Sequence, residues 1–208
     1  MKKILISLVA LSLVTFSVNA QLKFSASVGY ADKTAISKIE SGNTVTTESS
    51  DMGGFYLGGI ASYELMPNVA INGGLQFTLN TESEDEEMPF LGEITTKSTA
   101  MSLEIPVRAS YLLDLGVVGL FAYAGPVFEL GLVNKSSVTI GDNTTTSNYY
   151  GEDASLNRFD ILIGGGLGLA YGQLYLKCGY DYGLLNLSKV DGLKVHNAGL
   201  KAGLGVTF

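Results

Sequence analysis

The chain offers few side chains that could do chemistry. It contains one histidine, His196, and one cysteine, Cys178, so it lacks the ligand set of a structural zinc site and a partner for a disulfide. A hydrolytic site would need His196 as a base, next to a nucleophile and an orienting acid. Ser188 and Asp191 are the nearest candidates, but they lie in a predicted loop with no defined spacing to the histidine. We therefore expect no catalytic role for His196.

A glycine run and an acidic run also suggest chemistry. Gly164-Gly165-Gly166-Leu167-Gly168 resembles a phosphate-binding loop, but such a loop is followed by a helix whose N-terminus receives the phosphates, and a tight turn and a strand follow here. The segment 80–97 holds six acidic residues, but it lacks the Asp-x-Asp-x-Asp-Gly order of a calcium loop. We predict a solvated acidic loop there, and neither a metal nor a cofactor for the chain.

A third group of charged residues lies at alternate positions of strand-like segments, on the face that holds glycine and small polar residues. The cations and anions of this face nearly balance: Lys23, Arg108, Lys177 and Lys201 against Glu64, Glu104, Glu129, Asp160 and Asp181. Such a balance suits a narrow, poorly hydrated interior, because a buried charge is tolerated only when it is paired or hydrogen-bonded.

We therefore predict a structural network of polar side chains inside the fold. We expect Lys201 to meet Asp181 or another inward carboxylate, and Arg108 to interact with Glu104 on its own strand. The predicted network consists of Glu104, Arg108, Glu129, Lys177, Asp181 and Lys201.

The last twelve residues define the kind of strand that carries these charges. In 197–208 every second residue is apolar and the residues between are glycine or polar, a period of two that only a strand can use. Such a strand suits a wall between lipid and a narrow polar lumen. It resembles the closing strand of an outer-membrane barrel, so Leu204, Val206 and Phe208 are predicted to be the signal that the barrel assembly machinery reads.

Eight segments of this kind follow one another, joined by connections that alternate between long and short. A water-soluble lipocalin-type barrel would have its apolar side chains inside, opposite to the pattern here. We predict an all-β, eight-stranded antiparallel up-and-down transmembrane β-barrel, with Glu129 inward on its fifth strand. Its strands are expected at about 22–31, 54–64, 69–79, 98–113, 119–133, 158–171, 174–184 and 197–208.

The long connections are predicted outer loops. They cover residues 32–51, 80–97 and 134–157, with a shorter fourth loop through Asp191-Gly192. The β-branched residues of 134–157 favour an extension of the flanking hairpin above the membrane.

The amino-terminal segment predicts export. Met1-Lys2-Lys3 is positive, residues 4–18 are apolar, and Val18-Asn19-Ala20 fits a cleavage site, as in a secretory signal peptide at residues 1–20. The barrel domain is then 21–208. The formal net charge of the whole chain is −7, and removal of two lysines makes the remainder more acidic, so a nucleic-acid partner is excluded.

Five motifs support a family resemblance: Leu103-Glu104-Ile105-Pro106-Val107, Tyr123-Ala124-Gly125-Pro126, Arg158-Phe159-Asp160 with the glycine run, Tyr180-Asp181-Tyr182-Gly183-Leu184 through Asn186-Leu187, and Phe208. With them the chain resembles the PorT-like outer-membrane β-barrel family of Bacteroidota. The resemblance implies a barrel in the bacterial outer membrane. The best-known branch takes part in protein secretion and gliding, and no functional residues carry over.

We expect a small non-enzymatic protein whose barrel is a scaffold that displays polar and acidic outer loops for binding. A small porin and an accessory component of a secretion system are the alternatives, and a lipid hydrolase is the least favoured. The expected partners are outer-membrane lipid and lipopolysaccharide, the barrel assembly machinery and an extracellular ligand. The protein is expected to be a monomer.

Overall fold

A computed structural model describes residues 22–41, 44–88, 92–141, 143–150 and 155–208 of the chain. The predicted signal peptide, 1–20, lies outside the described residues. The strands are β1 (Leu22–Ser41), β2 (Thr44–Met66), β3 (Val69–Met88), β4 (Gly92–Asp114), β5 (Gly119–Ile140), β6 (Asn143–Asn148), β7 (Phe159–Tyr171), β8 (Leu174–Gly183) and β9 (Leu193–Thr207). No helix in these ranges is long and apolar enough to span a bilayer.

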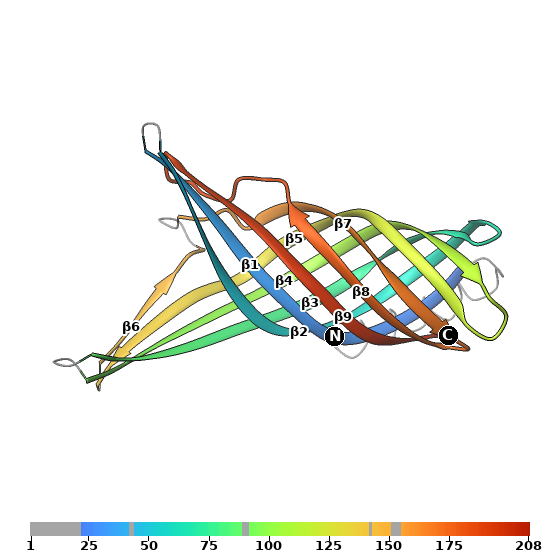
Figure 1. Cartoon of the computed structure of the whole chain (residues 1–208), viewed down its shortest axis with the longest axis horizontal. Helices are drawn as coiled ribbons and strands as arrows, with labels where there is room; N and C mark the ends of the chain where they lie inside the picture. The colour runs from blue at the N-terminus through green and yellow to red at the C-terminus, as the bar shows by residue number, and fades with distance from the viewer. Residues whose placement is uncertain (1–21, 42–43, 89–91, 142, 151–154) are drawn as a thin grey trace, which may run out of the picture.

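The strands close into a ring, seen side-on in Figure 1. They pair in the order β4-β3-β2-β1-β9-β8-β7-β5, and an additional β4–β5 pairing closes the circle. All neighbours are antiparallel, and β6 pairs only with the outer part of β5. The predicted all-β ring of eight antiparallel strands is confirmed.

The two faces of the wall differ as the alternation predicted. On β3, Leu75 is 56% exposed, while the adjacent Gln76 is 7% exposed. On β5, Phe128 and Leu130 point outward and Glu129 is buried, which is the predicted register. An apolar belt therefore surrounds a polar interior, the arrangement that lipid requires of a membrane barrel.

The short turns lie at the end of the ring where the chain enters and leaves it. The turn between β2 and β3 contains Asn68 at a φ of 70°, a left-handed conformation that asparagine tolerates, and Gly172 adopts a φ of 58° between β7 and β8. At the same end the Phe208 N–H donates a hydrogen bond of 2.8 Å to the carbonyl of Phe24, which joins the C-terminus to β1.

The outer segments differ from the prediction. Residues 32–41 and 44–51 were expected as a loop, but they continue β1 and β2 as a hairpin paired up to Ser41 and Thr44. Likewise β3 and β4 remain paired up to Met88 and Gly92, within the predicted acidic loop. Backbone ladders need no apolar face, and these segments are rich in β-branched threonine. The predicted extension within 134–157 is confirmed by β5 and β6.

Candidate functional site

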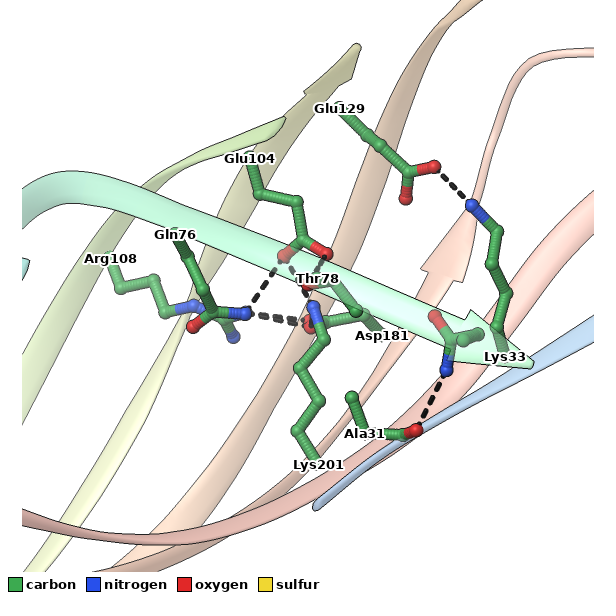
Figure 2. Close-up of polar contacts among 10 residues, drawn as sticks. Ala31, Lys33, Gln76, Thr78, Glu104, Arg108, Glu129, Asp181 and Lys201 are labelled. Atoms are coloured by element: carbon green, nitrogen blue, oxygen red, sulfur yellow. Dashed lines mark hydrogen bonds and ion pairs between the residues drawn. The ribbon is translucent and has the colours of Figure 1, made fainter. Parts of the chain in front are cut away.

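The polar interior holds two groups of ion pairs contributed by five strands (Figure 2). Glu104, Glu129 and Asp181 are buried, with exposed fractions of 3%, 5% and 4%. Carboxylates so far from water require cations or hydrogen-bond donors. The alternation of each strand fixes the direction of these side chains, because residues of one parity all face the lumen.

The central cluster, defined here as Glu104, Arg108, Asp181 and Lys201, spans the lumen. Lys201 Nζ forms an ion pair with Glu104 and lies 3.8 Å from Asp181 Oδ2. Arg108 Nη2 donates to both oxygens of Asp181, at 2.8 and 2.9 Å. The cluster thus links β4 across the interior to β8 and β9, which are themselves paired neighbours in the wall.

Two neutral side chains of β3 complete the hydrogen bonding of Glu104. Gln76 Nε2 donates to Oε2 at 3.1 Å, and Thr78 Oγ1 donates to Oε1 at 2.9 Å. Both donors lie on the inward face of β3, and Figure 2 shows them converging on the carboxylate. The cation and the two donors compensate the charge of this buried carboxylate, so the loss of any one of them would leave it less well paired.

The partner predicted for Arg108 was wrong. We expected Arg108 to interact with Glu104 on its own strand, but its guanidinium reaches Asp181 on β8. The lumen is narrow enough for a long side chain to cross it, so the tilt of the strands decides which charges meet. Lys201 does meet inward carboxylates, Glu104 and Asp181.

The second group pairs Glu129 with Lys33, a residue that the prediction missed. Lys33 Nζ forms an ion pair with Glu129, and their side chains are 12% and 6% exposed. We had ended the first strand near residue 31. Lys33 nevertheless continues the parity of Lys23 on β1, and this alternation was the signal that could have identified it.

Lys177 faces the lumen but has a different environment from the one predicted. Its ammonium lies 5.2 Å from the centroid of the Tyr56 ring. It forms no ion pair with any residue in the described ranges. The structure therefore brings five of the six predicted network residues into ion pairs and leaves Lys177 in a cation–π contact.

The central cluster divides the interior into two spaces of unequal size. A cavity of about 360 Å³ extends from the cluster to the short-turn end, where Asn68 and Gly172 line it. Beyond the cluster, a gap of about 20 Å³ lies between Lys33, Asn197 and Lys201, enough for roughly one water. The cluster therefore fills the middle of the barrel.

The histidine-based site is not assembled among the described residues. The His196 ring stacks on Tyr182, with centroids 6.0 Å apart, and its Nδ1 lies 3.2 Å from the carbonyl oxygen of Gly183. Ser188 Oγ accepts from the Val190 N–H at 3.0 Å and lies 3.3 Å from the Val190 carbonyl. None of the described hydrogen bonds joins Ser188 to His196. No group of three or more histidine, cysteine, aspartate or glutamate residues in the described ranges is arranged to hold a metal.

Above the ring, β1 to β5 continue and β6 is added. We call the paired parts of these strands beyond Gly54 on β2 and Asn80 on β3 the outer sheet, although it divides into two parts. Pairing between β2 and β3 stops at Gly54 and Asn80, so the β1–β2 hairpin separates from the β3–β4 hairpin, and the two diverge at the left of Figure 1. Asn80 Nδ2 donates to the carbonyls of Ala31 and Met52, at 2.8 and 3.0 Å, where the separation begins. Above this point Glu84, Asp85 and Glu86 are exposed to solvent.

The predicted assembly signal lies on the lipid-facing side of the terminal strand. Leu204 is 64% exposed and Phe208 is 74% exposed, and Val206 shares their parity. Its recognition by the assembly machinery stays a prediction.

A family model described as outer membrane protein beta-barrel domain matches residues 13–189. No curated protein sequence matches the chain. The chain is similar to many solved structures, among them those of the three proteins described next. For Ail, the attachment invasion locus protein of Yersinia pestis, the identity is 16%, the coverage is 90% of this chain and 99% of that one, and the TM-score is 0.49.

The other two structures are those of a surface protein and an outer membrane protease. Neisserial surface protein A is 20% identical, with 89% and 97% of the chains covered and a TM-score of 0.42. The outer membrane protease OmpT of Escherichia coli is 9% identical, with 92% and 98% covered and a TM-score of 0.47.

The matched region begins before β1 and includes the strands through β8, and it therefore contains most of the apolar belt and the central cluster except Lys201. The closed ring, the belt and the family match together place the protein in the outer membrane. The chain belongs to the outer membrane protein β-barrel domain family.

Proposed function

We propose that the protein is a non-enzymatic scaffold whose barrel anchors an acidic outer sheet, and that this sheet binds an extracellular partner. The proposal rests on the length of the strands, which is greater than a bilayer crossing requires. β4 has 23 residues, whereas a tilted strand crosses a bilayer in about 9–11. Roughly half of β4 therefore lies beyond the membrane, and the paired β3 and β5 extend with it.

The chemistry of this sheet suggests the kind of partner. Glu84, Asp85 and Glu86 are exposed on one hairpin, and Glu48 and Asp51 are exposed on the other. This number of negative charges favours a partner with a cationic surface, because the charges are complementary. At low salt they also steer the approach of such a partner.

The split between the hairpins offers a second mode of contact. Beyond Gly54 and Asn80, the outer edges of β2 and β3 have no partner strand in the described sheet. Unpaired strand edges present backbone N–H and C=O groups that can add a strand from another chain. A cationic extended polypeptide is therefore the partner that we favour.

A pull-down with the protein in lipid nanodiscs tests the proposal. The variant Glu84→Lys/Asp85→Lys/Glu86→Lys reverses the charge of one hairpin, and Glu48→Lys/Asp51→Lys reverses that of the other. Asp114→Lys, an exposed charge reversal at the short turn at the opposite end of the barrel, is the control and should retain the partner. We expect an extracellular polypeptide to be retained by wild type, released by salt, and lost from the triple variant. A partner retained equally by wild type and by barrels that lack the segment 82–97 would contradict binding by the outer sheet.

A small porin is the alternative function, and the filled interior argues against it. Ion pairs cross the middle of the lumen, and the gap beyond them has a volume of only about 20 Å³. We expect purified protein in a planar bilayer to give no steady conductance. Stable open channels of uniform size would make the porin the better assignment.

We also propose that the chain belongs to the PorT-like branch of barrels. Two of the motifs that carry this resemblance supply Glu104 and Asp181, both members of the central cluster. This placement supports a role of the motifs in building the barrel. We further expect contacts of the apolar belt with outer-membrane lipid and lipopolysaccharide, delivery by the barrel assembly machinery, and a monomeric state.

A further inference from the structure

The cavity at the short-turn end is larger than an eight-stranded barrel requires. Side chains ordinarily fill an interior of this width, yet about 360 Å³ is open here, within the usual range of small-molecule sites. The space exists because many residues that face it are small: Ser25, Ser62, Ala70, Ser110 and Gly179. The central cluster closes its inner end, and the exposed turn residues Asn68 and Gly172 lie at its outer end.

One side of the cavity is aromatic. The rings of Phe121 and Tyr123 are 6.2 Å apart at 32°, and those of Phe121 and Tyr175 are 6.1 Å apart at 78°. All three residues line the cavity. Adjacent rings that are tilted or edge-on to one another form a wall on which another flat ring can stack or pack edge to face.

Of the described residues, four cationic and three anionic side chains line the cavity, so one cation has no carboxylate partner there. Lys23 lies 3.5 Å from Glu64, Arg108 is paired with Asp181, and Lys201 is paired with Glu104. Lys177 is the fourth lining cation, and none of the three lining carboxylates is its ion-pair partner. An ammonium in a poorly hydrated lumen is stabilised by a counter-ion more than by a ring face alone.

Arg108 also lines the cavity, but its guanidinium is committed to the wall. Its Nη2 is bonded to Asp181, whereas its Nη1 is buried and has no hydrogen-bond partner in the described structure. Because Nη1 is buried, it presents no surface to the cavity, and of the described lining residues Lys177 is the cation left for an incoming carboxylate. The Arg108 guanidinium also lies 5.1 Å from the centroid of the Tyr123 ring, so it packs against one of the three aromatic residues of the cavity.

We propose that this cavity binds a small carboxylate that carries a planar ring and enters from the short-turn end. Lys177 supplies the counter-charge, and Phe121, Tyr123 and Tyr175 hold the ring. A single negative charge matches the single surplus cation, whereas a phosphate dianion would exceed it. The short turns of outer-membrane barrels face the periplasm, so the ligand is a periplasmic small molecule. This site is separate from the outer sheet and does not depend on its function.

Titration calorimetry with the barrel in lipid nanodiscs tests the proposal, with empty nanodiscs as the blank. The probes are benzoate, which has both the charge and the ring, acetate, which has only the charge, and benzyl alcohol, which has only the ring. We expect saturable binding of benzoate at one site, and affinities at least about tenfold lower for the other two. No saturable binding of benzoate, or equal affinity for acetate and benzoate, would overturn the assignment.

Three lysine variants locate the site. Lys177→Met should lower the affinity for benzoate about tenfold or more, Lys177→Arg should retain most of it, and Lys97→Met, at an exposed position of the outer sheet, should leave it unchanged. Because Lys177 is in no ion pair, its removal strands no carboxylate, and a gel shift between heated and unheated samples checks that the variant is folded. Benzoate affinity unchanged in folded Lys177→Met would refute the site.

Discussion

The barrel wall and the outer sheet are made of the same strands, but they are stabilised differently. In the wall, β3 and β4 have one face in lipid and one buried face whose charges are paired, as Glu104 is with Lys201. Above Asn80 the same two strands continue with exposed acidic side chains. The wall therefore depends on individual side chains, whereas the outer sheet depends mainly on its backbone ladder. Substitutions of the same kind should have very different effects in the two regions.

Removal of Asp181 should have the largest effect. Asp181→Ala leaves the Arg108 guanidinium buried without the carboxylate that binds it through two contacts, and stranding a buried charge costs about 3–5 kcal/mol. Urea unfolding in lipid vesicles measures the loss. Glu84→Ala on the outer sheet is the control, and a loss at Asp181 no larger than at Glu84 would contradict the distinction between the two regions.

The lipid-facing side of the wall should be nearly as sensitive. Leu75→Arg places a cation in the apolar belt and should cost on the order of 2–4 kcal/mol near the bilayer midplane. Gln76→Arg, on the adjacent position, points into the lumen beside Glu104 and the open cavity and should cost much less. The same unfolding assay compares the two, and equal losses would mean that the faces of β3 are reversed.

Deletion of Phe208 should affect assembly more than stability. The hydrogen bond that its N–H donates to Phe24 contributes about 1 kcal/mol, and its exposed ring buries little surface in the folded protein. If the terminal aromatic is the assembly signal, the deletion should slow insertion by the assembly machinery severalfold. The rate of appearance of heat-modifiable barrel in cells measures this, with Leu120→Ala, another outward apolar residue, as the control.

The outer sheet should tolerate change best. Glu84→Ala and Asp85→Ala remove exposed charges from a paired hairpin, so each should shift the free energy of unfolding by less than about 0.5 kcal/mol. A larger loss in the vesicle assay would show that the sheet is stabilised by its side chains after all.

The same contrast separates what the sequence predicted from what it did not. Alternation is a local property, so the outward direction of Leu75 followed from parity alone. On the fifth strand both faces hold large residues, and the charge of Glu129, placed inward, decided the register. The partner of Arg108 depends on the tilt and stagger of strands around a closed ring, which no single segment encodes. A search for pairs along one strand therefore gave Glu104 in place of Asp181.

The outer elements were missed for a different reason. Without an apolar face, residues 32–41 and 82–88 lack the signal by which a strand is normally identified, although the strands continue through them. The end assigned to the first strand removed Lys33 from the predicted network, and Glu129 lost its partner with it. The open cavity at the turn end could not be predicted from the sequence either. It forms because small residues from different strands meet in space, and no single segment shows which of them will meet.

The amide of Asn80 lies at the height at which the barrel opens. By donating to backbone carbonyls of both β1 and β2, it takes the place that the next rung of a β2–β3 ladder would occupy, at the last paired position of those strands. Asn80 thus caps the end of the β2–β3 ladder with its side chain. If this contact sets the position of the rim, an asparagine moved by two residues along β3 should shift the point at which β2 and β3 separate, without any change to the wall below.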